Sequence, residues 1–189
     1  MISEYPVRNI IFSNPFGRFF ISISPSVFVI IMFYILGPEI YTPALSVLLA
    51  FYFAVGIGWI VSPVIALASG MHPVGVIVFL VFISSQSSLI VSANYSLLED
   101  IPYLGLYMEK LRRNAENIIE EKEMVRKVGY VSIFWLMFLP VYGTGPNVMT
   151  LVGRLLSLRW KRVWMVVTFS ACVRFSIITT LLYFGYLTL

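Results

Sequence analysis

Long stretches without charge alternate with short charged ones along the chain. Residues 19–38, 40–98 and 128–153 contain no Lys, Arg, Asp or Glu, and residues 163–189 contain only Arg174. A helix needs about 20 consecutive apolar residues to cross the hydrocarbon core of a bilayer. Each of these stretches reaches that length, so the pattern predicts an all-α integral membrane protein built as a helical bundle.

Three segments are predicted to cross the bilayer completely, namely 19–37, 74–98 and 163–188. The other two apolar segments, 43–69 and 128–153, are interrupted well inside their length by residues that break or bend helices. In the first these are Gly56, Gly58 and Pro63, and in the second Pro140, Gly143, Gly145 and Pro146. All five segments and their connections are expected to form one membrane domain over residues 1–189.

The segment between the third and fourth apolar stretches has a different character. Residues 99–127 hold seven of the nine acidic residues and six of the thirteen basic ones. Apolar residues recur on one helical stripe within it, which is typical of an amphipathic helix. We predict such a helix over 100–127, lying at the membrane surface. The alternative is a helix within a water-exposed loop.

The composition narrows the class of protein. Hydrophobic residues make up 59% of the chain and charged residues 12%, against about 25% charged in soluble domains. The net charge of +4 comes from basic residues that flank apolar spans, where they set orientation rather than bind nucleic acid. One cysteine, Cys172, and one histidine, His72, predict neither a disulfide framework nor a metal site or other cofactor.

The basic residues also predict a topology, because Lys and Arg favour the cytoplasmic side. They form three clusters, at Arg8 and Arg18, within 99–127, and within 154–162. If every apolar segment crossed, at least one cluster would face the wrong side. If 43–69 and 128–153 each return to the side from which they enter, all three clusters become cytoplasmic. We therefore predict two re-entrant hairpins that enter from opposite faces. The alternative is that both are ordinary spans kinked at proline.

The second broken segment carries the main candidate site. Its tip contains Pro140, Gly143, Thr144, Gly145 and Pro146. Glycine permits backbone conformations closed to other residues, and Pro146 suits the first turn of a new helix. Backbone N–H groups at such a helix start favour an anion. The sequence therefore predicts a ligand-facing hairpin tip, or alternatively a tight structural turn.

Arg174 is the other candidate, since it lies near the middle of the last span. A charge at that depth costs at least about 2.5–3.5 kcal/mol and marks a functional site by default. Its expected partners are hairpin carbonyls, the polar run 84–88 with Gln86, or a bound anion. The alternative is a structural arginine that ties a hairpin to the bundle. Pro63 is expected on the opposing hairpin tip.

Residues 125–186 resemble the small multidrug export protein family, a relative of the DedA/VTT membrane proteins. The resemblance rests on Arg126-Lys-Val-Gly-Tyr130, followed by an apolar run and then Pro140-Val-Tyr-Gly-Thr-Gly145. It covers about a third of the chain. It implies two opposed re-entrant hairpins and, by kinship, transport or lipid handling. The acid and the arginine that the family often shows in its first hairpin are absent from 57–70.

These observations together predict a multi-pass transporter-like protein of the cell membrane. We expect it to move an anionic lipid or a small anionic solute at the meeting of the two hairpin tips. It is not expected to be an enzyme, because no span contains the His or Asp that acid–base catalysis would need. The alternative is a non-transporting scaffold or subunit. Its partners would be the bilayer and either a second copy, as a homodimer, or another membrane subunit.

Overall fold

The computed structural model describes residues 15–54, 57–95, 123–138, 144–156 and 158–187. These residues form seven α-helices and no strand, as predicted. Three of the helices are long and apolar enough to cross a membrane. They are α2 (Pro15–Leu36), α5 (Pro73–Ala93) and α10 (Trp160–Leu187).

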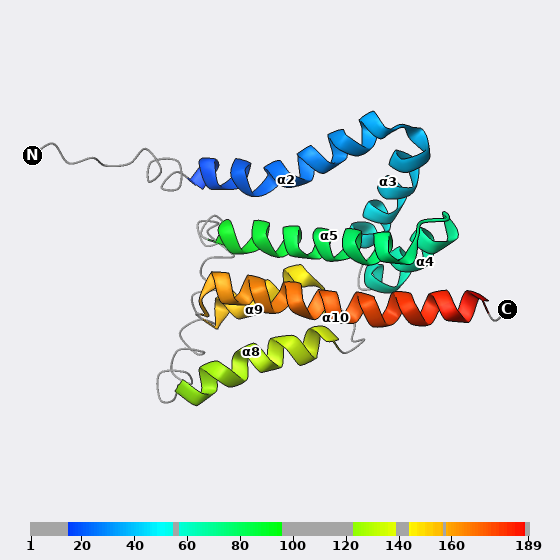
Figure 1. The fold of residues 1–189 in the computed structure, drawn as a ribbon. Helices are drawn as coiled ribbons and strands as arrows, with labels where there is room; N and C mark the ends of the chain where they lie inside the picture. Colours follow the sequence, from blue (N-terminus) through cyan, green and yellow to red (C-terminus); the bar gives the residue numbers. More distant parts are fainter. Residues whose placement is uncertain (1–14, 55–56, 96–122, 139–143, 157, 188–189) are drawn as a thin grey trace, which may run out of the picture.

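Helices α5 and α10 pack against each other along the centre of the molecule, and the remaining helices surround this pair (Figure 1). The core between these two helices consists of almost fully buried apolar side chains. They include Val76 and Leu80 of α5, and Val163, Val167, Ala171 and Phe175 of α10. Outside this core the helices expose large apolar side chains such as Phe20, Phe28 and Phe184, as expected of surfaces that face lipid.

The polar turn in the middle of α5 connects this helix to four others. Each of the residues 85–88 in this turn forms a hydrogen bond with a different neighbouring helix. The partners are Trp164 and Thr168 of α10 for Ser85, Ser22 of α2 for Gln86, Tyr52 of α3 for Ser87, and Thr150 of α9 for Ser88. Polar side chains commonly join helices in this way within membranes.

The first broken segment forms a pair of helices, α3 (Pro38–Phe53) and α4 (Gly58–Ala68). The chain turns at Ala54, whose N–H donates to the carbonyl of Ala50 at 3.1 Å, while Gly58 N–H donates to Ala54 at 2.7 Å. Helix α4 then runs back toward the end of the molecule where α3 began (Figure 1). With 16 and 11 residues, both helices are shorter than the roughly 20 residues of a full span.

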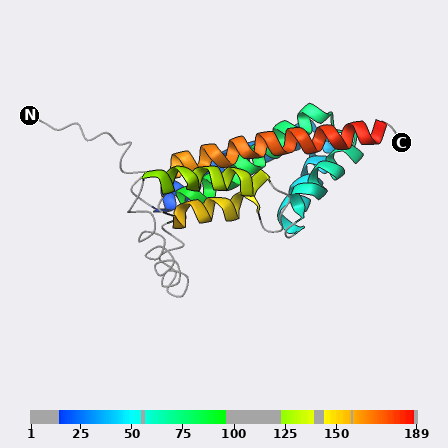
Figure 2. The same cartoon turned by 90° about the horizontal axis from the view of Figure 1, so that it is seen from below.

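The second broken segment also forms a pair, α8 (Glu123–Phe138) and α9 (Pro146–Leu155). These helices have 16 and 10 residues and pack against each other and against α10. Figures 1 and 2 both place this pair at the end of the molecule opposite α3 and α4. The two pairs thus approach the middle of α10 from opposite ends.

Several boundaries differ from those predicted. The first pair begins at Pro38 rather than at residue 43, because Gly37, with φ +106°, separates α2 from α3 by a single residue. Helix α8 begins at Glu123, so its first five residues belong to the segment predicted as the surface helix 100–127. The rest of that segment lies outside the described residues.

Candidate functional site

Arg174 lies midway along α10 and is almost completely enclosed, with 2% of its surface exposed. Its guanidinium stacks over the ring of Trp59, with 3.8 Å between the guanidinium carbon and the ring centroid. Its Nη1 donates a long hydrogen bond of 3.4 Å to the carbonyl of Thr144. A buried arginine over an indole gains more from this cation–π contact than an exposed one, because water does not compete for the charge.

The two partners of Arg174 come from the two broken segments. Trp59 is the second residue of α4, beside the turn of the first pair. Thr144 comes two residues before α9, at the turn of the second pair. Arg174 therefore contacts both turns at once and fixes the place along α10 where they meet.

Close packing at the first turn holds Trp59 in position. A Cβ on Gly58 would lie 2.4 Å from the carbonyl oxygen of Phe51 and 2.8 Å from that of Ala50. The start of α4 can approach the end of α3 this closely only with glycine at 58. The ring of Phe51 also lies against that of Phe175, with 6.4 Å between centroids, so α3, α4 and α10 converge beside Arg174.

The second turn leads directly into the start of α9. Thr144 is buried, Gly145 is the N-cap residue, and Pro146 occupies the first helical position, as predicted for proline. Met149 N–H donates to the Gly145 carbonyl at 3.0 Å. Gly145 has φ −71° and ψ 164°, a conformation open to any residue. The expectation that glycine's special conformations shape the tip is thus wrong at Gly145.

Two donor nitrogens of Arg174, Nε and Nη2, have no hydrogen-bond partner among the residues that the structure describes. Arginine carries five N–H donors in a planar fork, and buried donors are normally paired. The fork geometry suits a carboxylate or phosphate group, which accepts two parallel hydrogen bonds. The site thus offers a buried positive charge with unused donors.

The remaining candidate residues occupy different places. Pro63 is completely buried within α4 and lies one helical turn beyond Trp59. The side-chain nitrogen of Gln86 donates to the Ser22 carbonyl of α2, and the place of Gln86 in the candidate site stays a prediction. Of the three partners expected for Arg174, the structure shows a hairpin carbonyl. Pro140 and Gly143 lie outside the described residues.

Trp59 was not among the residues that the sequence singled out. A tryptophan directly after a glycine, inside an interrupted apolar segment, was the available signal. Cation–π pairing then makes it a natural partner for a lone intramembrane arginine. Among the described residues, no group of three or more His, Cys, Asp or Glu side chains could hold a metal ion.

Comparison with known proteins gives one family. Residues 44–177, more than half of the chain, match the sequence model of the family described as "Putative small multi-drug export protein". The chain belongs to this family. The match to this export-protein family runs from α3 into α10 and includes Trp59, Thr144 and Arg174, but not α2. No curated protein and no solved structure matches the chain. The kinship to DedA/VTT proteins stays a prediction.

Proposed function

We propose that this chain is a multi-pass transport protein of the cell membrane that moves a molecule carrying an anionic group. One observation carries the proposal: buried Arg174 contacts both hairpin turns and keeps two donor nitrogens without a partner among the described residues. The description of the family as an export protein supports transport rather than catalysis.

In this proposal the pairs α3/α4 and α8/α9 are re-entrant hairpins that enter from opposite faces. Their helices are too short to cross a core of about 30 Å, and each pair turns near the middle of α10. Interrupted helices at membrane depth are tolerated where they line a cavity or are buried in protein. Paired half-helices that meet near the midplane are a common way to build a transport site.

Charge favours an anionic substrate over a cationic one. The sequence has no Asp or Glu between residues 40 and 98 or after residue 123, so a proton-coupled cation exchanger would lack a carboxylate in these segments. Arg174 and the start of α9, two residues beyond Thr144, both attract negative charge. A phosphate-bearing lipid headgroup and a small anionic solute share this chemistry.

The proposal is tested by flux through vesicles containing the purified protein. One arm follows a fluorescent phosphatidylglycerol between leaflets with a membrane-impermeant quencher, and the other follows entrapped inorganic phosphate. Wild type is expected to accelerate one of the two. Arg174→Gln should lower that rate by about 10- to 150-fold, as the loss of a buried charge-assisted hydrogen bond worth about 1.5–3 kcal/mol implies.

Arg162→Gln is the matched control, because Arg162 belongs to the same helix but is exposed. It should transport at the wild-type rate. If Arg174→Gln and Arg162→Gln have equal flux in a folded protein, Arg174 does not bind the substrate. If wild type accelerates neither probe, the transport proposal fails for both classes of anion.

The same contacts favour a second candidate, a scaffold or subunit that does not transport. Stacking on Trp59 and bonding a backbone carbonyl are also what a structural arginine would do. In that case Arg174→Gln would lower the free energy of unfolding, and wild type would show no flux of either probe and would co-purify with a membrane partner.

A further inference from the structure

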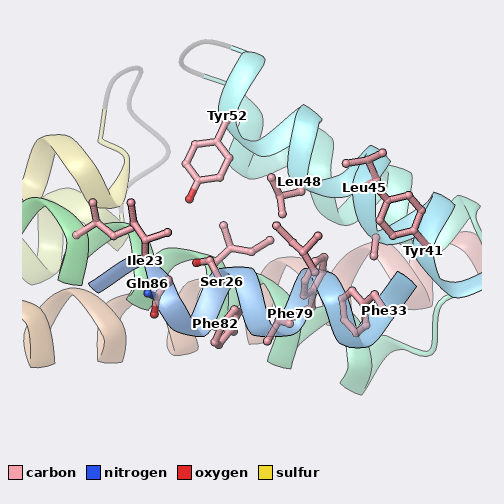
Figure 3. Close-up of a pocket in the computed structure, with 15 residues that line it drawn as sticks. Ile23, Ser26, Phe33, Tyr41, Leu45, Leu48, Tyr52, Phe79, Phe82 and Gln86 are labelled. Carbon is pink, nitrogen blue, oxygen red and sulfur yellow. The ribbon is translucent and has the colours of Figure 1, made fainter. Parts of the chain in front are cut away.

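A cavity lies between α2, α3 and α5, and Arg174 is not among the residues that line it. Its volume is about 270 Å³, just below the range of roughly 300–1,000 Å³ for ligand pockets. Figure 3 shows side chains from the three helices converging on it. There is room for one slender molecule, whereas a helix of a second copy, about 10–12 Å across with its side chains, would not fit.

The cavity is long and narrow. Its lining residues recur at helical spacing, from Ile23 to Phe33 on α2 and from Phe79 to Ile90 on α5. At a rise of 1.5 Å per residue, ten or eleven residues span about 15–17 Å. That length is about half of a hydrocarbon core roughly 30 Å thick, which is the depth of one leaflet.

The walls offer apolar contact and few free polar groups. Four of the fifteen lining side chains are polar, namely Ser26, Tyr41, Tyr52 and Gln86. The amide nitrogen of Gln86 already donates to Ser22, and the Tyr52 hydroxyl is already paired with Ser87. Figure 3 shows Tyr52 near one end of the cavity and Phe33 and Tyr41 near the other. A cavity without several available polar partners does not hold ordered water, so its occupant should be apolar.

The cavity is continuous with the surface that faces lipid. Ile30 of α2 and Leu45 of α3 both line it, and they are also 40% and 36% exposed at the outside of the molecule. On the neighbouring surface of α2, Phe28 is 68% exposed. In a bilayer, the medium that meets this opening is therefore hydrocarbon rather than water.

From its length, its apolar walls and its opening to lipid, we infer that this cavity binds one acyl chain of a membrane lipid. A compact hydrophobic molecule would fill only part of a channel about 15 Å long. The inference does not depend on the proposed transport function, because the chain lies against α2, α3 and α5 whatever Arg174 binds. Helix α2, which supplies one wall, precedes the residues that match the family.

The test uses the full-length protein in phosphatidylcholine vesicles that contain a trace of phosphatidylcholine with a diazirine on its acyl chain. After irradiation, mass spectrometry locates the labelled residues. Ser26 lines the cavity, so Ser26→Phe places a ring inside it. Labelling of cavity residues such as Phe82 should fall about tenfold, because the ring removes the volume that the chain needs.

Ser24→Phe is the matched control, since Ser24 is exposed on the same helix and does not line the cavity. Cavity labelling should remain at the wild-type level in this variant. Leu48→Phe fills the cavity from α3 and replaces Ser26→Phe if that variant does not fold. Equal cavity labelling in the filled and control variants, or wild-type labelling confined to outer residues such as Phe28, would overturn the inference.

Discussion

Arg174 is an arginine enclosed by helices that carry no acid near their centres. Placing its charge at the middle of a span costs at least about 2.5–3.5 kcal/mol. The indole face of Trp59 and the carbonyl of Thr144 offset part of that cost. Neither contact neutralises the charge, so an anion that binds here gains both a full counter-charge and unused donors.

The stacking of Arg174 on Trp59 predicts an energetic coupling between the two side chains. Arg174→Met and Trp59→Leu, alone and combined, form a double-mutant cycle for the free energy of unfolding in detergent. We expect a coupling of roughly 1–2 kcal/mol, the size of a desolvated cation–π contact.

The exposed Arg162 supplies the control, because Arg162→Met combined with Trp59→Leu should be additive within about 0.5 kcal/mol. If the free-energy changes in the Arg174 cycle are also additive within about 0.5 kcal/mol, the stacking of Arg174 on Trp59 contributes nothing to stability.

Sequence reasoning identified Arg174 because a lone charge in an apolar span is conspicuous. It also included the hairpin carbonyl among the expected partners, but it did not find Trp59. The reason is that the sequence does not fix how each helix is rotated about its own axis within the bundle. Spacing along a helix says which residues share a face, but which neighbour that face meets depends on how five or more helices pack. Gln86 and Ser85 are adjacent in sequence and bond opposite neighbours, α2 and α10.

At the scale of elements, the short helices matter most. Helices α3, α4, α8 and α9 each have one terminus near the middle of α10, where the terminal N–H or C=O groups need partners. The turn at Ala54 supplies some of these partners through backbone hydrogen bonds. Tight contact between α3 and α4 at Gly58 completes the first hairpin.

Gly58→Ala is predicted to lower the free energy of unfolding by about 1–3 kcal/mol, because the new methyl group would collide with backbone carbonyls rather than with movable side chains. Denaturant titration in micelles, followed by tryptophan fluorescence, measures the change.

Gly75→Ala is the matched substitution, since a Cβ there meets nothing within 4 Å and the residue lies in helix α5. It should be neutral or stabilise the protein by up to about 1 kcal/mol. Equal effects of the two substitutions would mean that α3 and α4 do not approach as closely as described.

Most of the elements could be predicted because uncharged runs of membrane length are unambiguous. Their ends could not, and Pro38 shows why. Pro38 and Glu39 look like the end of the first span, yet they begin α3. Proline at the first helical position and an acid in the first turn are also signals of a helix start. Only the backbone at Gly37 decides between the two readings.

At the scale of the whole molecule, most of the described basic residues lie at one end. Arg159, Lys161 and Arg162 flank the start of α10, at the end where α2 begins and α5 finishes (Figure 1). The opposite end holds Glu39 and the turn before α5. If basic residues mark the cytoplasmic face, the α8/α9 pair enters from the cytoplasm and the α3/α4 pair from outside.

The central claim is that both helix pairs return to the face from which they enter, and cysteine accessibility in sealed vesicles tests it directly. In a Cys172→Ser background, single cysteines replace Glu39 and Ser69 at the two ends of the first pair. Two others replace Lys127 near the start of the second pair and Lys161 just after that pair. A membrane-impermeant maleimide should label Glu39→Cys and Ser69→Cys only from outside, and Lys127→Cys and Lys161→Cys only from inside. If the two members of either pair label from opposite sides, that segment is an ordinary span and the opposed hairpins do not exist.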